Sequence, residues 1–247
     1  MSAQLENITQ SLREAVLAGQ YDPGVAIREQ AVAESQGVSR TLARLAMGAL
    51  EREGLLTHEP NRGFRVRSFT VDEVADAIEV RGELESLAAR QAAERGLTSD
   101  LEQRLRAILA EAETLYKGLA LEDVSARARW IDLNAAFHAG IVEASGNRAL
   151  APALENLCRI PLAGPRAIVF NSTLADHGLS QVRGAHADHE QILDAIVLRQ
   201  GTRAASLIRE HAYRSGRNKR QNFEAIENAK LHPLPAGLAL IRRKETG

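Results

Sequence analysis

This 247-residue sequence has little cysteine, few aromatic residues and almost no net charge. Its one cysteine, Cys158, cannot form an internal disulfide, which excludes the disulfide-stabilised secreted class and fits a reducing compartment. A net charge of −1 excludes a uniformly basic surface for nucleic acid. We expect a cytoplasmic protein in which Cys158 is a buried structural thiol beside Leu157 and Ile160.

Long apolar runs are also absent. No segment approaches the roughly 18 consecutive apolar residues that a membrane-spanning helix needs. The N-terminus lacks the positively charged segment and apolar core of an export signal. We therefore expect neither export nor membrane insertion. A chain of 247 residues is long enough for two domains with a sizeable core.

The most informative segment that is present covers residues 37–56. Gly37 suits a tight turn between helices because glycine accepts a positive φ, and Ser39 suits the N-cap of a helix that begins at Arg40. Helical periodicity predicts one buried face for this helix, consisting of Leu42, Leu45, Ala46, Ala49 and Leu50. Arg40, Thr41 and Arg44 then lie exposed near its N-terminal turns, where a DNA-reading helix meets the major groove.

The same helix taken alone also fits a solvated amphipathic helix, so its neighbours decide between the two interpretations. A short helical segment at 28–35 precedes it and follows a turn at 22–24. Gly54 ends the helix, and two short β-prone runs flank residues 60–63. This order of helices, turn and hairpin predicts a winged helix-turn-helix.

These segments together resemble the N-terminal domain of the GntR family of bacterial transcription regulators. The resemblance covers nearly all of residues 5–68 and is carried by LREAVLAG at 12–19, DPG at 22–24, GVSRT at 37–41, EREGL at 51–55 and RGF at 62–64. In that family the recognition helix and the wing contact operator DNA, which implies this role for Ser39, Arg40, Thr41, Arg44, Arg62 and Gly63. The family often has Pro-Val where this chain has Leu42-Ala43, and Glu where it has Leu45. These departures bear on the operator sequence rather than on the DNA-binding role.

Charge in this part of the chain is balanced. Residues 1–68 hold eight arginines, no lysine and eight acidic residues. Binding to DNA would therefore depend on local clusters, formed by Arg40, Arg44, Arg62, Arg65 and Arg67. The rigid fork of arginine suits bidentate contacts with guanine edges and phosphates. A dimer would double these contacts.

The domain boundary is predicted at residues 68–70, where Thr70 can cap a new helix with Glu73 at its third position. From there the pattern is helical, with helices expected at 71–95, 98–119, 122–145, 147–158 and onward, 176–199 and 201–224. The expected fold is mainly α: a winged helix-turn-helix with a small β-wing at 1–68, an all-α bundle for effector binding and dimerisation at 69–225, and a flexible tail at 226–247.

Three histidines are predicted to face the core of this bundle. Asn134 and His138 are four residues apart and share an inward helical face. His189 and His211 lie on the apolar faces of two further helices. One histidine on an apolar face is more often a core residue than a ligand, but three with an inward amide favour a metal site with open positions for water or a small molecule.

This part of the chain resembles the FadR C-terminal domain, the helical effector domain of many GntR regulators, over about residues 70–220. The resemblance is carried by NAAFH at 134–138, EASGN at 143–147, HEQILDAI at 189–196 and His211. It implies that Asn134, His138, His189 and His211 bind one divalent ion, zinc first and nickel or manganese as alternatives. Asn134 stands where the family often has an acid, and an amide oxygen is a weaker, neutral donor.

An effector is expected to bind beside this ion. His186 could assist the metal or line the pocket. Arg81 falls on the apolar stripe of its helix, where a buried guanidinium needs an anionic partner: either the carboxylate of the effector or a protein acid such as Glu85. Arg166 and Asn171 are further candidates for the pocket wall.

We therefore expect a homodimeric transcription regulator that binds double-stranded operator DNA and responds to a small carboxylic acid held beside a divalent metal. A metal-responsive regulator without an organic effector is one alternative. A metal-dependent enzyme with an accessory DNA-binding domain is another alternative. Its candidate general bases would be Asp132 and Glu143. At 100° per residue they are offset by 600° and 500° from His138, so both turn away from the ligand face.

Overall fold

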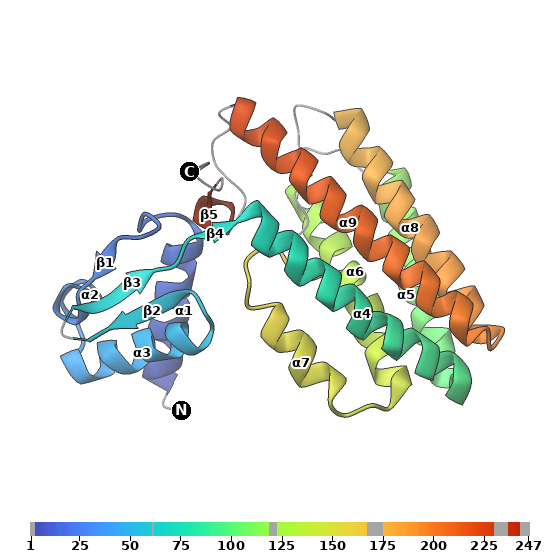
Figure 1. The fold of residues 1–247 in the computed structure, drawn as a ribbon, viewed down its shortest axis with the longest axis horizontal. Coiled ribbons are helices and arrows are strands. Elements are labelled where there is room, and N and C mark those ends of the chain that lie inside the picture. Colours follow the sequence, from blue (N-terminus) through green and yellow to red (C-terminus); the bar gives the residue numbers. More distant parts are fainter. Residues whose placement is uncertain (1–2, 61, 119–122, 167–174, 230–236, 243–247) are drawn as a thin grey trace. The chain divides into compact units, whose positions relative to one another are not determined.

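The computed structural model describes residues 3–60, 62–118, 123–166, 175–229 and 237–242 (Figure 1). The chain forms two compact units. Unit 1 comprises Met1–Val74, Arg159–Leu162 and His232–Gly247, and unit 2 comprises Ala75–Cys158 and Ala163–Leu231. Within the described ranges, no helix combines the length and the apolar character that crossing a membrane requires.

Unit 1 contains the predicted winged helix-turn-helix. Its elements in chain order are α1 (Ala3–Leu17), β1 (Ala26–Ile27), α2 (Glu29–Gln36), α3 (Arg40–Arg52), β2 (Leu56–Glu59) and β3 (Gly63–Val66). The three strands form an antiparallel sheet in the order β1-β3-β2, and the β2–β3 hairpin pairs Leu56 with Val66 and Glu59 with Gly63. Helix α3 packs against α1, α2 and β2.

The start of α3 agrees with the sequence prediction, and its buried face agrees at Ala46, Ala49 and Leu50 but not at Leu45. Gly37 has φ 62°, and the Ser39 hydroxyl accepts a hydrogen bond from the Leu42 amide at 3.2 Å. The side chains of α3 that are buried are Ala43, Ala46, Met47, Ala49 and Leu50. Leu45 is 52% exposed, because it lies 200° around the helix from the fully buried Ala43.

The C-terminal segment of unit 1 corrects a second expectation. Residues 238–240 form a 3₁₀ turn, η2 (Leu238–Leu240), and β5 (Ile241–Arg242) pairs in parallel with β4 (Phe69–Thr70). Leu240 is fully buried, and the Gly237 amide donates to the Leu17 carbonyl at 2.9 Å. The flexible tail predicted for 226–247 is therefore wrong for residues 237–242, whose apolar run is too short to give a periodic signal.

Unit 2 is built from helices whose predicted bounds lie within a few residues of the observed ones. They are α4 (Val71–Arg95), which begins in unit 1, α5 (Ser99–Lys117), α6 (Val124–Ser145), α7 (Leu150–Leu157), α8 (Ala175–Val197) and α9 (Gly201–Ala229). The predicted cap of α4 is present: the Thr70 amide donates to Glu73 Oε2 at 2.6 Å, and the Glu73 amide donates to Thr70 Oγ1 at 3.1 Å. The fold class is mainly α, as expected.

The core of unit 2 brings distant helices together. Phe137 and Ile141 of α6 pack with Ile192 of α8 and Ile208 of α9. Helix α4 approaches α9 closely at Gly82, where an added Cβ would lie 2.5 Å from the Cβ of Ala212. Glycine at this position allows α4 to place its buried polar side chains beside the middle of α9.

Candidate functional site

The predicted DNA-contacting residues lie at the start of α3 and on the β2–β3 wing of unit 1. Arg40, Arg44, Arg62 and Gly63 line one hollow of about 790 Å³. Ser39 and Thr41 are exposed at the first turn of the same helix. Gly63 also has a structural reason to be glycine, since its φ is 88° and a Cβ there would lie 3.0 Å from the Ile27 carbonyl oxygen.

The arginines of this unit divide into two groups. Arg65 is paired with Glu59 at 2.7 Å, and Arg67 stacks its guanidinium 4.5 Å above the centre of the Phe69 ring. Both therefore have partners within unit 1, and Arg65 also lines the hollow.

In the part of the chain that the structure describes, no carboxylate lies within ion-pair distance of Arg40 or Arg62, while Arg44 lies 3.6 Å from Glu29. Arg28, an exposed residue that the sequence analysis did not single out, lines the same hollow. It is the N-cap residue of α2, with extended backbone, rather than the first residue of the helical segment predicted at 28–35.

In unit 2, the three predicted histidines converge. His138 of α6, His189 of α8 and His211 of α9 are all buried, and their potential ligand atoms lie within 4.8 Å of one another. Asn134 is one turn before His138 and is also buried, with its Nδ2 donating to the Pro165 carbonyl at 2.7 Å. That bond leaves the amide oxygen of Asn134 as the atom available to an ion.

Two carboxylates contact the histidines from behind. The Nδ1 atom of His211 lies 3.0 Å from Asp188 Oδ2, and the other oxygen of Asp188 accepts from Arg214. His138 Nδ1 lies 3.1 Å from Glu85 Oε2, although the two atoms are not aligned as a hydrogen bond. Carboxylates in this position fix the orientation of ligating imidazoles and raise their basicity.

The partner of Arg81 is now identified. Arg81 is buried, its Nε lies 3.5 Å from Glu85 Oε1, and its Nη1 donates to the Ala163 carbonyl. The protein acid Glu85 is therefore one partner of Arg81, and the effector carboxylate considered from the sequence stays a prediction. Burial would raise the pKa of Glu85, but His138 and Arg81 lower it to about 2, so the carboxylate remains ionised.

The electrostatics of the cluster favour neutral imidazoles. Burial lowers the pKa of His189 well below its ordinary value, and the nearby His211 and His138 lower it further. Burial also lowers the pKa of His211, although Asp188 acts in the opposite direction. Neutral imidazole is the metal-binding form. Among the residues that the structure describes, His189 Nε2 is buried without a hydrogen-bond partner, and a bound cation would satisfy it.

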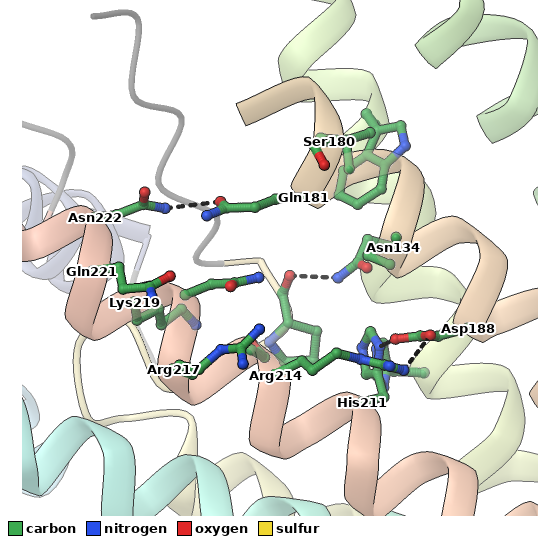
Figure 2. A pocket seen from close by; sticks show the side chains of 18 of the residues that line it. Asn134, Ser180, Gln181, Asp188, His211, Arg214, Arg217, Lys219, Gln221 and Asn222 are labelled. Carbon is green, nitrogen blue, oxygen red and sulfur yellow. Dashed lines mark hydrogen bonds and ion pairs between the residues drawn. The ribbon is translucent and has the colours of Figure 1, made fainter. Parts of the chain in front are cut away.

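A cavity of about 460 Å³ opens beside the cluster (Figure 2). His138, His211, Asn134, Asp188 and Arg81 line it, together with residues further along α8 and α9. This volume is in the range of small-molecule sites. The cavity lies wholly within unit 2.

Other candidates lie elsewhere. His186 is buried with its ring 5.0 Å from Tyr116 and is not part of the cavity lining, so the structure gives it no contact with an effector there. Arg166 is exposed and paired with Asp132. Asn171 lies outside the described residues. Cys158 is exposed, which corrects the expectation of a buried thiol: it follows the last turn of α7 instead of facing the core.

The residues that sequence reasoning missed are those whose role depends on contacts between helices. Asp188 precedes His189 but is turned 100° from it, toward α9. Trp130 and Arg214 line the cavity without any motif to mark them. The two acids considered as bases for an enzyme, Asp132 and Glu143, are exposed and paired with Arg166 and Arg104, so neither faces the histidines.

Comparison with known families finds two matches that together cover most of the chain. Residues 4–66 match the bacterial regulatory proteins of the gntR family, and residues 76–214 match the FCD domain. The first match coincides with the winged helix-turn-helix, and the second contains all three clustered histidines.

Individual relatives are similar over long segments. An HTH-type transcriptional regulator of Bacillus subtilis (strain 168), YdhC, is 32% identical over 60% of this chain and 66% of its own length. The HTH-type transcriptional repressor GlaR of Escherichia coli (strain K12) is 26% identical over 81% of this chain and 88% of its own. The solved structure of E. coli McbR/YncC has the same fold, with a TM-score of 0.62 at 20% identity over 90% of this chain and all of the other.

Proposed function

Because this chain belongs to the GntR family of bacterial regulatory proteins and carries an FCD domain, we propose that a small carboxylic acid bound beside a divalent metal controls its binding to operator DNA. The chain is a DNA-binding transcription regulator, as its family and relatives are. Our proposal concerns what it senses and how. We assign DNA binding to residues 1–68, and effector binding and dimerisation to residues 69–225. We place the protein in the cytoplasm.

The observation that carries the proposal is the group of three buried histidines beside a cavity. His138, His189 and His211 would hold the ion, with Asn134 Oδ1 as a fourth donor. Three imidazoles favour zinc, with nickel or manganese as alternatives. When bound, the ion provides positive charge and open positions for the oxygens of a carboxylate. Asp188 and Glu85 hold two of the imidazoles in place from behind.

For DNA, we propose contacts from Ser39, Arg40, Thr41 and Arg44 on α3 and from Arg62 and Gly63 on the wing. That assignment is supported by the exposure of the side chains of Ser39, Arg40, Thr41, Arg44 and Arg62. Within the described residues, no acid lies at ion-pair distance from Arg40 or Arg62. A homodimer would present two such surfaces to the halves of a near-palindromic operator, whose major-groove faces repeat about every 34 Å. A change in the spacing of the two surfaces would break the match.

Coupling between the two sites must be reciprocal. If the acid weakens operator binding by some factor, operator DNA weakens binding of the acid by the same factor. Relief of repression by the acid is the direction that the family resemblance favours, and activation would show the opposite sign in the same experiment.

Two substitutions separate the sites. His138→Ala is expected to abolish the response to a carboxylic acid while leaving operator binding intact, and Arg44→Ala is expected to do the reverse. Arg104→Ala, which changes an exposed arginine of unit 2 paired with Glu143, serves as the control and should change neither. If His138→Ala left both metal content and the acid response unchanged, the proposed site would be wrong.

The two alternatives give different results in the same assay. Operator affinity that follows metal concentration alone, with no effect of any acid, would indicate a metal sensor. Turnover of an added carboxylic acid would indicate an enzyme. The side chains of Asp132 and Glu143 are exposed and are not placed to act as its base. The arrangement of the site favours a bound acid over either.

A further inference from the structure

The cavity beside the histidine cluster holds more positive than negative charge. Its lining contains one carboxylate, Asp188, and three arginines, Arg81, Arg214 and Arg217. Asp188 is already bound by Arg214 and His211, and Arg81 is bound by Glu85. The lining therefore has a surplus of cations before any metal ion is added.

Arg217 is the clearest part of this surplus. Counting only the residues that the structure describes, no carboxylate lies within ion-pair distance of its guanidinium. Nearby, burial and then repulsion by Arg81 lower the pKa of Lys219 well below its ordinary value. An anion in the cavity would relieve that repulsion and pair with Arg217.

The cavity also offers hydrogen-bond donors that have no acceptor. Trp130 is 2% exposed, and its buried indole Nε1 has no hydrogen-bond partner in the described part of the chain. An indole N–H can only donate, so it needs an oxygen from whatever fills the cavity. Gln181 Oε1 accepts from Asn222 Nδ2 at 3.0 Å, which leaves the buried Nε2 of Gln181 unpartnered as well.

These features lie at two ends of the cavity. Figure 2 shows Asp188 and His211 at one end and the Gln181–Asn222 pair at the other. On α9, His211 and Asn222 are separated by eleven residues, which is about 16 Å at the helical rise. A short acid with one carboxylate cannot occupy both ends. Most of the side chains between them are polar, among them Ser215, Asn218 and Gln221.

We propose that the effector, whose existence rests on the function proposed above, is a hydroxylated acid with two acidic groups, either two carboxylates or a carboxylate and a phosphate. One acidic group lies at the histidine cluster and the second pairs with Arg217. A hydroxyl oxygen of the same molecule accepts a hydrogen bond from the indole of Trp130. A fatty acid or an aromatic monoacid would leave this donor and the surplus charge unsatisfied.

Calorimetric titration of the full-length, zinc-loaded protein with matched probes tests this inference. Glucarate has a carboxylate at each end and hydroxyls between, and 6-phosphogluconate replaces one carboxylate with a phosphate. Gluconate lacks the second acidic group, and adipate lacks the hydroxyls. We expect glucarate or 6-phosphogluconate to bind at least about tenfold more tightly than both gluconate and adipate. Gluconate loses a charged contact and adipate leaves a buried donor unsatisfied, and each loss costs about this factor. The tighter of the two identifies the second acidic group.

Two variants assign the contacts. Arg217→Gln should weaken binding of the preferred diacid by about tenfold and leave gluconate unchanged, whereas Arg203→Gln, an exposed arginine of α9 outside the cavity, should affect neither. Trp130→Phe should weaken binding of the hydroxylated diacid more than that of adipate.

The results separate failure of this inference from failure of the proposed function. If gluconate binds as tightly as glucarate and 6-phosphogluconate and changes operator binding, the two-acid inference is overturned, and if adipate does so, the hydroxyl part is overturned. In either case the acid-responsive regulator stands. If none of the probes binds and neither these nor other carboxylic acids alter operator binding, the proposed function fails, and this inference fails with it.

Discussion

The Nδ1 atom of His211 on α9 lies 3.0 Å from Asp188 Oδ2 on α8. Burial raises the pKa of Asp188, but its bonds with His211 and Arg214 lower it by more. The pKa therefore lies below its ordinary value, and the carboxylate stays ionised. An ionised partner at Nδ1 keeps the proton on that nitrogen and leaves Nε2 free as a donor to an ion. The contact joins the two helices that form one side of the cavity.

Asp188→Asn should therefore reduce the affinity for zinc by about 10- to 100-fold, the usual effect of removing a partner behind a ligating histidine. The amide keeps the size of the side chain but loses its charge. Competition titration against a zinc-binding dye measures the change. Asp132→Asn alters an exposed acid of the same unit and serves as the control. Equal zinc affinity in the two variants would mean that Asp188 does not support the site.

Helix α4 contains two Arg–Glu pairs of the same spacing and distance. Arg81–Glu85 and Arg90–Glu94 both lie 3.5 Å apart, but the first is buried and the second is about half exposed. Arg81→Met should destabilise the metal-free protein by about 3 kcal/mol, because it leaves the carboxylate of Glu85 buried without its cation. Arg90→Met should cost less than about 1 kcal/mol. Urea unfolding curves compare the two, and equal midpoints would contradict the burial argument.

The close approach of α4 and α9 predicts an unusual response to alanine. An added Cβ at Gly82 would lie 2.5 Å from Ala212, so Gly82→Ala should cost about 1–3 kcal/mol despite the better helix propensity of alanine. At Gly216, also on this contact, the nearest side-chain atom is 3.8 Å away on Ile78. Gly216→Ala should be neutral or stabilise by up to about 1 kcal/mol. Thermal unfolding that ranks the two variants in the opposite order would refute the close packing.

The C-terminal strand gives a prediction for unit 1. Leu240 is fully buried beside β5, so Leu240→Ala should destabilise this unit by about 3 kcal/mol. Amide hydrogen exchange should then accelerate in β4 and at the end of α1, where Gly237 bonds to Leu17. Leu198→Ala removes a leucine that is 62% exposed in unit 2 and should leave that exchange unchanged. Unaltered exchange in both variants would mean that residues 237–242 do not stabilise unit 1.

Much of this architecture could be predicted because it depends on local signals. Gly37, Ser39 and the Thr70–Glu73 capping box are local stop and start signals, and the structure contains each of them. Helical spacing placed Asn134 and His138 on one inward face, and it correctly turned Asp132 and Glu143 away. Periodicity therefore identified inward-facing residues of the histidine cluster without knowledge of how the helices pack.

The features that were missed depend on contacts between segments far apart in sequence. Asp188 meets His211 only because α8 packs on α9, and Gly82 gains its role only from the position of Ala212. Leu45 was assigned to the wrong face of α3, because a hydrophobic residue was taken as buried although it lies opposite Ala43. The strand at residues 241–242 is too short for any periodic pattern and forms by pairing with β4.

The central claim, that an acid bound at the histidine cluster controls DNA binding, is tested most directly by fluorescence anisotropy. Operator DNA from the flanks of the coding region would be titrated at fixed salt with zinc-loaded and with metal-stripped protein, each with and without the preferred acid. We predict that the acid changes operator affinity by about 5- to 150-fold in the zinc-loaded protein and not in the stripped protein. An equal change in both, or no change with any acid, would contradict this account.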